Sequence, residues 1–118
     1  MFDPRQFLDL ADALLDDSKY EKQGRIRTCI GRAYYAAFLL SMKKLQEIGH
    51  SFREVDRLHK DVISTLMNEK KHFISSQLDK LREYRVNADY KMKSKITSEL
   101  GKRCIMLSRK IMHSIEQI

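Results

Sequence analysis

Apolar residues recur at spacings of three and four along most of this chain, which is the periodicity of helices that bury one face. No segment shows sustained alternation of apolar and polar residues, the pattern typical of half-buried strands. One proline and four glycines are the only strong helix breakers in 118 residues. The pattern therefore predicts five helices joined by short links, without a sheet.

Capping residues mark the ends of the first two predicted helices. Asp3 is placed to cap the first, with Pro4 at the first helical position, where its missing N–H costs nothing. The second runs from about Glu21 to Ile48 and ends at Gly49, a residue type common after helix ends. The first helix has the apolar stripe Phe7, Leu10, Ala11, Leu14 and Leu15. The second has a wider stripe, which predicts a central position: Ile26, Cys29, Ile30, Ala33, Tyr34, Ala37, Phe38, Leu40 and Leu45.

Similar signals predict three further helices. Residues 51–54 (Ser-Phe-Arg-Glu) have the form of a capping box that opens the third helix. A polar turn over 68–72 separates the third helix from the fourth, and a basic connection over 91–96 leads to Thr97, the expected cap of the fifth. The expected inner face of the third helix is Val55, Leu58, His59, Val62, Leu66 and Met67. The fourth helix has the row Ile74, Leu78, Leu81, Arg85 and Ala88, and the fifth has Leu100, Cys104, Leu107, Ile111, Ile115 and Ile118.

These elements predict an all-α fold, an up-and-down helical bundle of four long helices plus a short N-terminal helix that acts as a cover. Residues 1–118 supply enough chain for a single domain. Because a domain of this size buries a modest fraction of its surface, pairing with a second chain would add buried area.

Charge and cysteine usage narrow the function classes. The formal net charge of +7 favours anionic partners such as nucleic acid, although a solvated lysine-rich surface with 16 interspersed acidic residues explains it equally well. Cys29 and Cys104 lie far apart on apolar stripes, which indicates reduced core residues. Without a signal peptide, a membrane-spanning run or a cluster of metal-ligating residues, we expect a soluble cytoplasmic protein without a metal or cofactor.

One residue in the fourth predicted helix breaks the apolar pattern. Arg85 lies four residues after Leu81 and three before Ala88, on the face that should be packed. A guanidinium cannot lose its charge on burial, so it needs a partner, an interface or a cleft. One interpretation is a local pair with Asp89 at i+4 near the helix end. The other is an anion-binding arginine in a groove between subunits.

Two stretches resemble the HEPN domain family (higher eukaryotes and prokaryotes nucleotide-binding). Residues 27–38 (Arg-Thr-Cys-Ile-Gly-Arg-Ala-Tyr-Tyr-Ala-Ala-Phe) are similar to the Arg-Ala-Tyr-Tyr-Ala core of that family's second helix. Residues 81–90 (Leu-Arg-Glu-Tyr-Arg-Val-Asn-Ala-Asp-Tyr) are similar to the Arg-x-x-Ala-Asp-Tyr signature that ends its fourth helix. Between them, His59 resembles the family's third helix in position and type, so the resemblance spans nearly the whole chain.

The resemblance implies a helical bundle that forms a homodimer along its signature helices. It also implies a partner, a minimal nucleotidyltransferase, often in a toxin–antitoxin pair. Other members are metal-independent endoribonucleases that use an Arg and, four to six residues further on, a His. In those, the Arg stabilises the phosphate and the His assists proton transfer.

This sequence departs from the nuclease pattern because Tyr90, Lys91 and Met92 occupy the positions that would hold the His. A phenol with its ordinary pKa of about 10 is a poor proton shuttle near neutral pH, so Tyr90 is a weak candidate for a catalytic role. Arg85 keeps its capacity to bind phosphate.

The candidate nucleotide- or RNA-binding residues surround Arg85. In the implied dimer two copies of Arg85 would face each other, with Asn87 and Asp89 to orient them and Tyr90 to stack on a base or bind a phosphate. Of Tyr34 and Tyr35, we expect one in the core and the other, Tyr35, at the groove. Arg32, with Arg25 on the same face of the second helix, could join this binding surface or simply be solvated. Lys91, Lys93 and Lys95 on the connection would extend a positive rim, or be solvated like other loop lysines. His59 is most simply a satisfied core histidine.

Three functions follow from these observations. The first is a dimeric nucleotide- or RNA-binding partner subunit of a minimal nucleotidyltransferase. The second is a metal-independent endoribonuclease toxin with an atypical site formed by Arg85, Asn87, Asp89 and Tyr90. The third is a non-catalytic dimeric scaffold in which Arg85 fixes the dimer.

Overall fold

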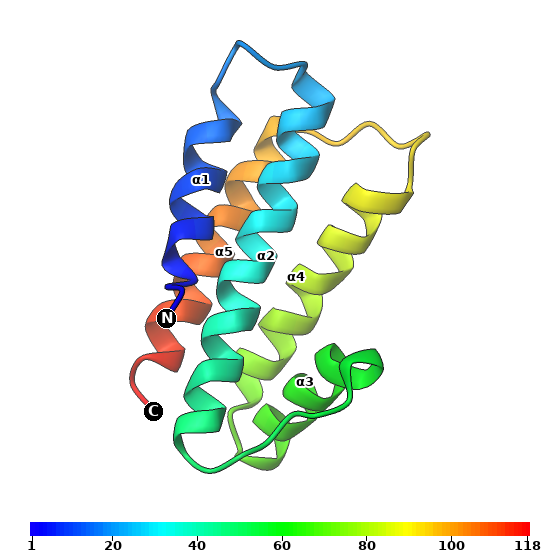
Figure 1. Ribbon diagram of the computed structural model, residues 1–118. Helices are drawn as coiled ribbons and strands as arrows, with labels where there is room; N and C mark the ends of the chain where they lie inside the picture. The colour runs from blue at the N-terminus through cyan, green and yellow to red at the C-terminus, as the bar shows by residue number, and fades with distance from the viewer.

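The computed structural model describes residues 1–118 as a bundle of five α-helices with one short 3-10 helix and no strand (Figure 1). The helices are α1 Arg5–Leu15, α2 Lys22–Glu47, η1 Val55–Arg57, α3 Leu58–Asn68, α4 His72–Tyr90 and α5 Ser98–Ile115. The predicted all-α bundle with a short N-terminal helix is confirmed. No helix combines the length and apolar character needed to cross a membrane.

Helix α2 is the centre of the bundle, as its wide apolar stripe predicts. Its 26 residues span about 39 Å, close to the 43 Å length of the whole molecule. It packs against α1, α3, α4 and α5 (Figure 1). A buried hydrogen bond of 2.7 Å from the Ser108 hydroxyl to the Ala33 carbonyl joins α5 to its middle. A Cβ at Gly101 would lie 2.8 Å from Cδ1 of Leu15, so the missing side chain lets α5 approach the end of α1 closely.

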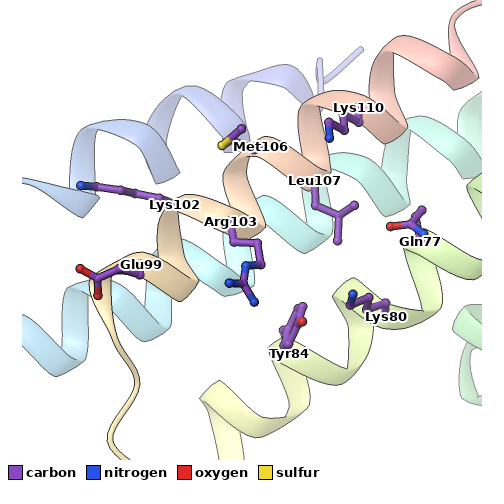
Figure 2. A pocket seen from close by; sticks show the side chains of 9 residues that line it. All are labelled: Gln77, Lys80, Tyr84, Glu99, Lys102, Arg103, Met106, Leu107 and Lys110. Atoms are coloured by element: carbon purple, nitrogen blue, oxygen red, sulfur yellow. The ribbon is translucent and has the colours of Figure 1, made fainter.

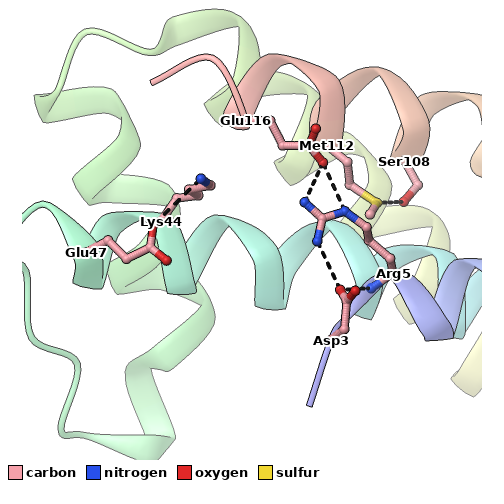
Figure 3. Close-up of polar contacts among 7 residues, drawn as sticks. All are labelled: Asp3, Arg5, Lys44, Glu47, Ser108, Met112 and Glu116. Atoms are coloured by element: carbon pink, nitrogen blue, oxygen red, sulfur yellow. Dashed lines mark hydrogen bonds and ion pairs between the residues drawn. The ribbon is translucent and has the colours of Figure 1, made fainter. Parts of the chain in front are cut away.

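The two ends of the chain lie together at one end of the bundle. The Asp3 carboxylate accepts the Arg5 backbone N–H at 3.0 Å, so Asp3 caps α1 although the helix begins at Arg5, one residue after Pro4. The Arg5 guanidinium reaches the Glu116 carboxylate just beyond α5, at 2.8 and 3.1 Å (Figure 3). This contact fixes the start of α1 against the end of α5.

Two other predicted helix ends are confirmed. The Thr97 hydroxyl accepts the Leu100 backbone N–H at 3.1 Å and caps α5. Gly49 follows the end of α2 with a φ of +107°, a backbone conformation that residues with a Cβ rarely adopt. Local sequence signals at these positions therefore act as predicted.

The predicted capping box over 51–54 is wrong. This segment is irregular, Glu54 is extended, and Ser51 makes no capping hydrogen bond. The first turn is η1, and α3 begins only at Leu58. Because Val55 lies in that separate turn, it is not in register with α3 and is 81% exposed, while Met67 at the far end of α3 is 44% exposed.

Helix α1 buries most of its predicted apolar stripe, with Leu8 in place of Leu10, and Phe7 and Leu14 are partly buried. Leu8, Ala11 and Leu15 are buried, whereas Leu10 is 47% exposed. Leu8, Ala11 and Leu15 also have helical spacing, and it is this face that meets α2 and α5.

Both cysteines are free and buried, as predicted. Burial raises the pKa of the Cys29 thiol to about 11 and that of Cys104 to about 12. Both side chains are therefore neutral thiols packed as small apolar groups.

Candidate functional site

Arg85 lies in the buried row of α4, where the sequence places it. Ile74, Leu78, Leu81 and Ala88 of the same row are buried in the core. The Arg85 side chain is itself only 11% exposed. An arginine with this degree of burial is held in one place by its surroundings.

The guanidinium of Arg85 has aromatic and ionic neighbours. Its central carbon lies 5.4 Å from the Tyr34 ring centre and 5.6 Å from that of Tyr35, within the range of cation–π contact. Nη1 donates to the Asp89 carboxylate at 3.3 Å, which confirms the predicted local pair. Nε is buried without a partner, whereas Nη2 has no partner and is not buried. One donor group of Arg85 therefore remains available to a ligand.

Arg82, one turn earlier on α4, extends this positive charge. It is partly buried, forms no ion pair, and its Nε is also buried without a partner. Side chains at i and i+3 lie on the same helix face about 5–6 Å apart. Of the two guanidinium groups, only that of Arg85 has a carboxylate partner, Asp89.

Helix α3 brings His59 to the same place. Its Nδ1 lies 2.6 Å from the Tyr34 hydroxyl, and its ring stacks on Phe38 with the ring centres 4.4 Å apart. Burial lowers the pKa of His59, and the charges of Arg85 and Arg82 lower it further. The imidazole is therefore neutral near pH 7 and hydrogen-bonded, as expected of a satisfied histidine.

The two tyrosines divide as predicted. Tyr34 is fully buried, and burial raises the pKa of its phenol well above the ordinary value. Tyr35 is half-buried, with the Arg85 guanidinium 5.6 Å and the Arg32 guanidinium 5.1 Å from its ring centre. Tyr35 is thus flanked by two arginines at the edge of the site.

Asn87 and Tyr90 lie on other faces of α4. At about 100° per residue, Asn87 is roughly 200° and Tyr90 roughly 140° around the helix from Arg85. Tyr90 is 70% exposed, and no hydrogen bond joins either residue to Arg85. Of the residues predicted to accompany Arg85, Asp89 and Tyr35 contact it within a single chain, and Arg32 contacts the other side of the site through Tyr35.

Arg27 holds the end of α4, a role that no local pattern in the sequence indicates. Its Nη1 donates to the carbonyls of Ala88 at 3.0 Å and Lys91 at 3.1 Å, and its Nη2 donates to that of Ser94. Gln23 pairs with the backbone of Ile96 through both its amide atoms, at 2.7 and 3.2 Å. The basic connection is therefore fixed to α2, and its lysines Lys91, Lys93 and Lys95 remain exposed.

The site contains no group of three or more His, Cys, Asp or Glu residues arranged to hold a metal ion, and none occurs elsewhere in the chain. It brings together two guanidinium groups, a neutral imidazole and a half-buried phenol, groups that are able to bind a phosphate or a carboxylate.

The chain is similar to a protein of an archaeon. No protein-family profile matches the chain. An "uncharacterized protein MJ0628" of Methanocaldococcus jannaschii is 30% identical over 110 residues, which covers 80% of this chain and 66% of that protein. The chain thus spans just under two thirds of that relative's length, and the relative's name assigns no activity.

Proposed function

We propose that this chain is a HEPN-like nucleotide- or RNA-binding helical protein that works as a homodimer and as the partner subunit of a minimal nucleotidyltransferase. The observation that carries the proposal is the state of Arg85. It is 11% exposed and lies against two tyrosine rings, and its Nη2, which is not buried, has no partner.

A phosphate group fits the chemistry of this site. Arginine presents planar pairs of donors that match phosphate oxygens, and Arg82 adds a second guanidinium one turn away. Asp89 neutralises one of these charges, so a surplus positive charge remains for an anion. Tyr35, at the half-buried edge, offers an aromatic face for a base.

The proposed homodimer would complete the site. Asn87 and Tyr90 point away from Arg85 within one chain. In a dimer, these residues of the second copy would approach Arg85 of the first. The proposal of a dimer and of a nucleotidyltransferase partner rests on the resemblance of residues 27–38 and 81–90 to the HEPN signatures. The small size of the domain also favours association.

Replacement of Arg85 tests the proposal. We expect Arg85→Gln to weaken binding of a labelled RNA oligonucleotide or of ATP by about tenfold or more, because a charge-assisted hydrogen bond contributes ~1.5–3 kcal/mol. Arg57→Gln is a matched control, since Arg57 pairs with Asp61 at i+4 as Arg85 pairs with Asp89 but is 60% exposed. Equal affinities of Arg85→Gln and the parent protein, with circular dichroism unchanged, would refute it.

An endoribonuclease is the second candidate, and the position of His59 favours it. A neutral imidazole lies on the same two tyrosines as Arg85, so a proton acceptor is present although the signature lacks one. RNA cleavage that persists in chelator and is lost in both Arg85→Ala and His59→Gln would establish this activity. Absence of cleavage, with the partner protein present and absent, would count against it.

The scaffold alternative gives a different result in the same experiments. If Arg85 only fixes the dimer, Arg85→Gln converts dimer to monomer on a sizing column while the parent protein shows no affinity for RNA or nucleotide. Mass and affinity measured on the same samples therefore separate the two functions.

A further inference from the structure

A second basic surface lies between α4 and α5, away from the face of α4 that carries Arg85. It is a hollow of about 500 Å³, within the size range of small-ligand sites. Tyr84, Met106 and Leu107 supply its apolar part. Figure 2 shows Arg103 of α5 and Tyr84 of α4 pointing toward one another across it, with Lys80 one turn from Tyr84.

This α4/α5 groove has a surplus of positive charge. Four basic side chains and one acidic side chain, Glu99, line it. None of the four basic residues forms an ion pair, so no carboxylate of the chain neutralises them. The basic residues on α5 extend from Lys102 to Lys110, about 12 Å along the helix.

We propose that the α4/α5 groove binds a short stretch of single-stranded nucleic acid. Phosphates would lie on Arg103, Lys80 and Lys110, and a base would stack on Tyr84 beside Met106. A positive groove with an aromatic platform is the arrangement by which proteins hold single strands without reading their sequence. An acidic peptide would use the cations but has no need for the ring, so the aromatic residue decides between these ligands.

This proposal rests on the proposed function for its class of ligand, nucleic acid, but it concerns a separate surface. Residues 84 and 85 point in directions about 100° apart on α4, Tyr84 toward α5 and Arg85 toward the tyrosines of α2. Variants at the two surfaces therefore report on them independently.

The test is the affinity of labelled twelve-nucleotide RNA and single-stranded DNA, measured by fluorescence anisotropy at several salt concentrations. We expect Arg103→Gln to weaken binding about fivefold or more and to reduce the slope of log affinity against log salt by about 0.7, the value for one lost phosphate contact. Tyr84→Leu keeps the apolar packing and removes the ring, so we expect a loss of about fivefold or more for both probes.

Arg109→Gln is the matched control, because it makes the same charge change on the same helix outside the groove, where Arg109 pairs with Asp12. Equal losses in Arg103→Gln and Arg109→Gln would overturn the proposal, since they would reflect net charge alone. Tyr84→Leu without effect, together with equal binding of polyglutamate and RNA, would overturn it in favour of an acidic protein ligand. Loss of binding in Arg85→Gln but not in Arg103→Gln would reject the groove and keep the proposed function. Loss of binding in Arg103→Gln but not in Arg85→Gln would support the groove and reject the Arg85 site.

Discussion

At the scale of single residues, the surroundings of His59 hold it neutral. Removal from water disfavours the charged imidazolium, and two nearby arginines disfavour it further. The Tyr34 hydroxyl lies 2.6 Å from Nδ1 and satisfies one ring nitrogen without adding charge. The same surroundings keep the imidazole unprotonated near pH 7 and make it a weaker base than a free histidine.

Stability should therefore depend on pH through His59. Its pKa in the folded protein is below the unfolded value of about 6.5, so below that pH the unfolded chain binds a proton that the folded chain does not. The free energy of unfolding then falls as pH drops from about 6.5 toward the folded pKa. We expect the urea midpoint to decrease between pH 7.5 and 5.5, and to decrease less in His59→Gln.

His113→Gln serves as the control for that experiment, because His113 is an exposed residue in the last turn of α5. It should retain the pH dependence of the parent protein. An identical pH dependence in His59→Gln and the parent would contradict the assignment.

The residues of the site differ in how far the sequence predicts them. The burial of Arg85 and its pairing with Asp89 follow from helical spacing alone, since Leu81 and Ala88 fix the face and Asp89 lies at i+4. The nearness of His59 to Arg85 does not follow from spacing. It depends on how α3 packs against α2 and α4, which no local pattern specifies.

At the scale of elements, α2 supplies polar support as well as core. Arg27 and Gln23 bind backbone groups of the 91–96 connection and of the last turn of α4. The last carbonyls of a helix lack partners within it, and a positive side chain there also complements the helix dipole. These bonds therefore position the end of α4, which carries Asp89 and Tyr90.

Loss of this support should destabilise the protein. We expect Arg27→Met to lower the free energy of unfolding by about 1–3 kcal/mol, because carbonyls of the part-buried helix end lose their donor. Urea unfolding would give this value, and hydrogen exchange should become faster in residues 91–96.

Arg25→Met is a matched comparison on the same helix, since Arg25 makes a single bond of 3.3 Å to the Leu15 carbonyl. Its effect should be smaller and should leave exchange in 91–96 unchanged. Equal effects of the two variants would show that Arg27 has no special role.

Helix ends are predictable where one residue type has a single physical role. Gly49 follows α2 with a positive φ, and the Thr97 hydroxyl caps α5 by accepting one backbone N–H. Both occur as predicted. The capping-box pattern of 51–54 fails because those residues instead lead from α2 to α3 as an irregular segment. A cap forms only where the following turn becomes α-helical, and here that turn is η1.

At the scale of the whole molecule, the net charge of +7 goes with many basic residues that have no carboxylate partner. Four of these basic residues line the α4/α5 groove, and two partly buried arginines lie on another face of α4. In the proposed homodimer, two copies of that arginine pair would face each other and repel. An anion between them would remove the repulsion.

Dimerisation should therefore depend on the kind of anion present. We expect sedimentation equilibrium of the 14.0 kDa chain to show more dimer in phosphate than in chloride at equal ionic strength. Arg85→Gln should abolish the difference between the two salts, while Arg57→Gln should preserve it. A monomer in both salts at high micromolar concentration would refute the dimer.

The central position of α2 also determines how long its apolar surface stays exposed to water during synthesis. Its apolar surface is complete at residue 47, but α5, which covers part of it through Ser108 and its neighbours, ends only at residue 115. At roughly 5–20 residues per second, synthesis leaves several seconds between the two. During that interval the face of α2 that α5 will cover lacks its partner, the kind of apolar surface that chaperones bind.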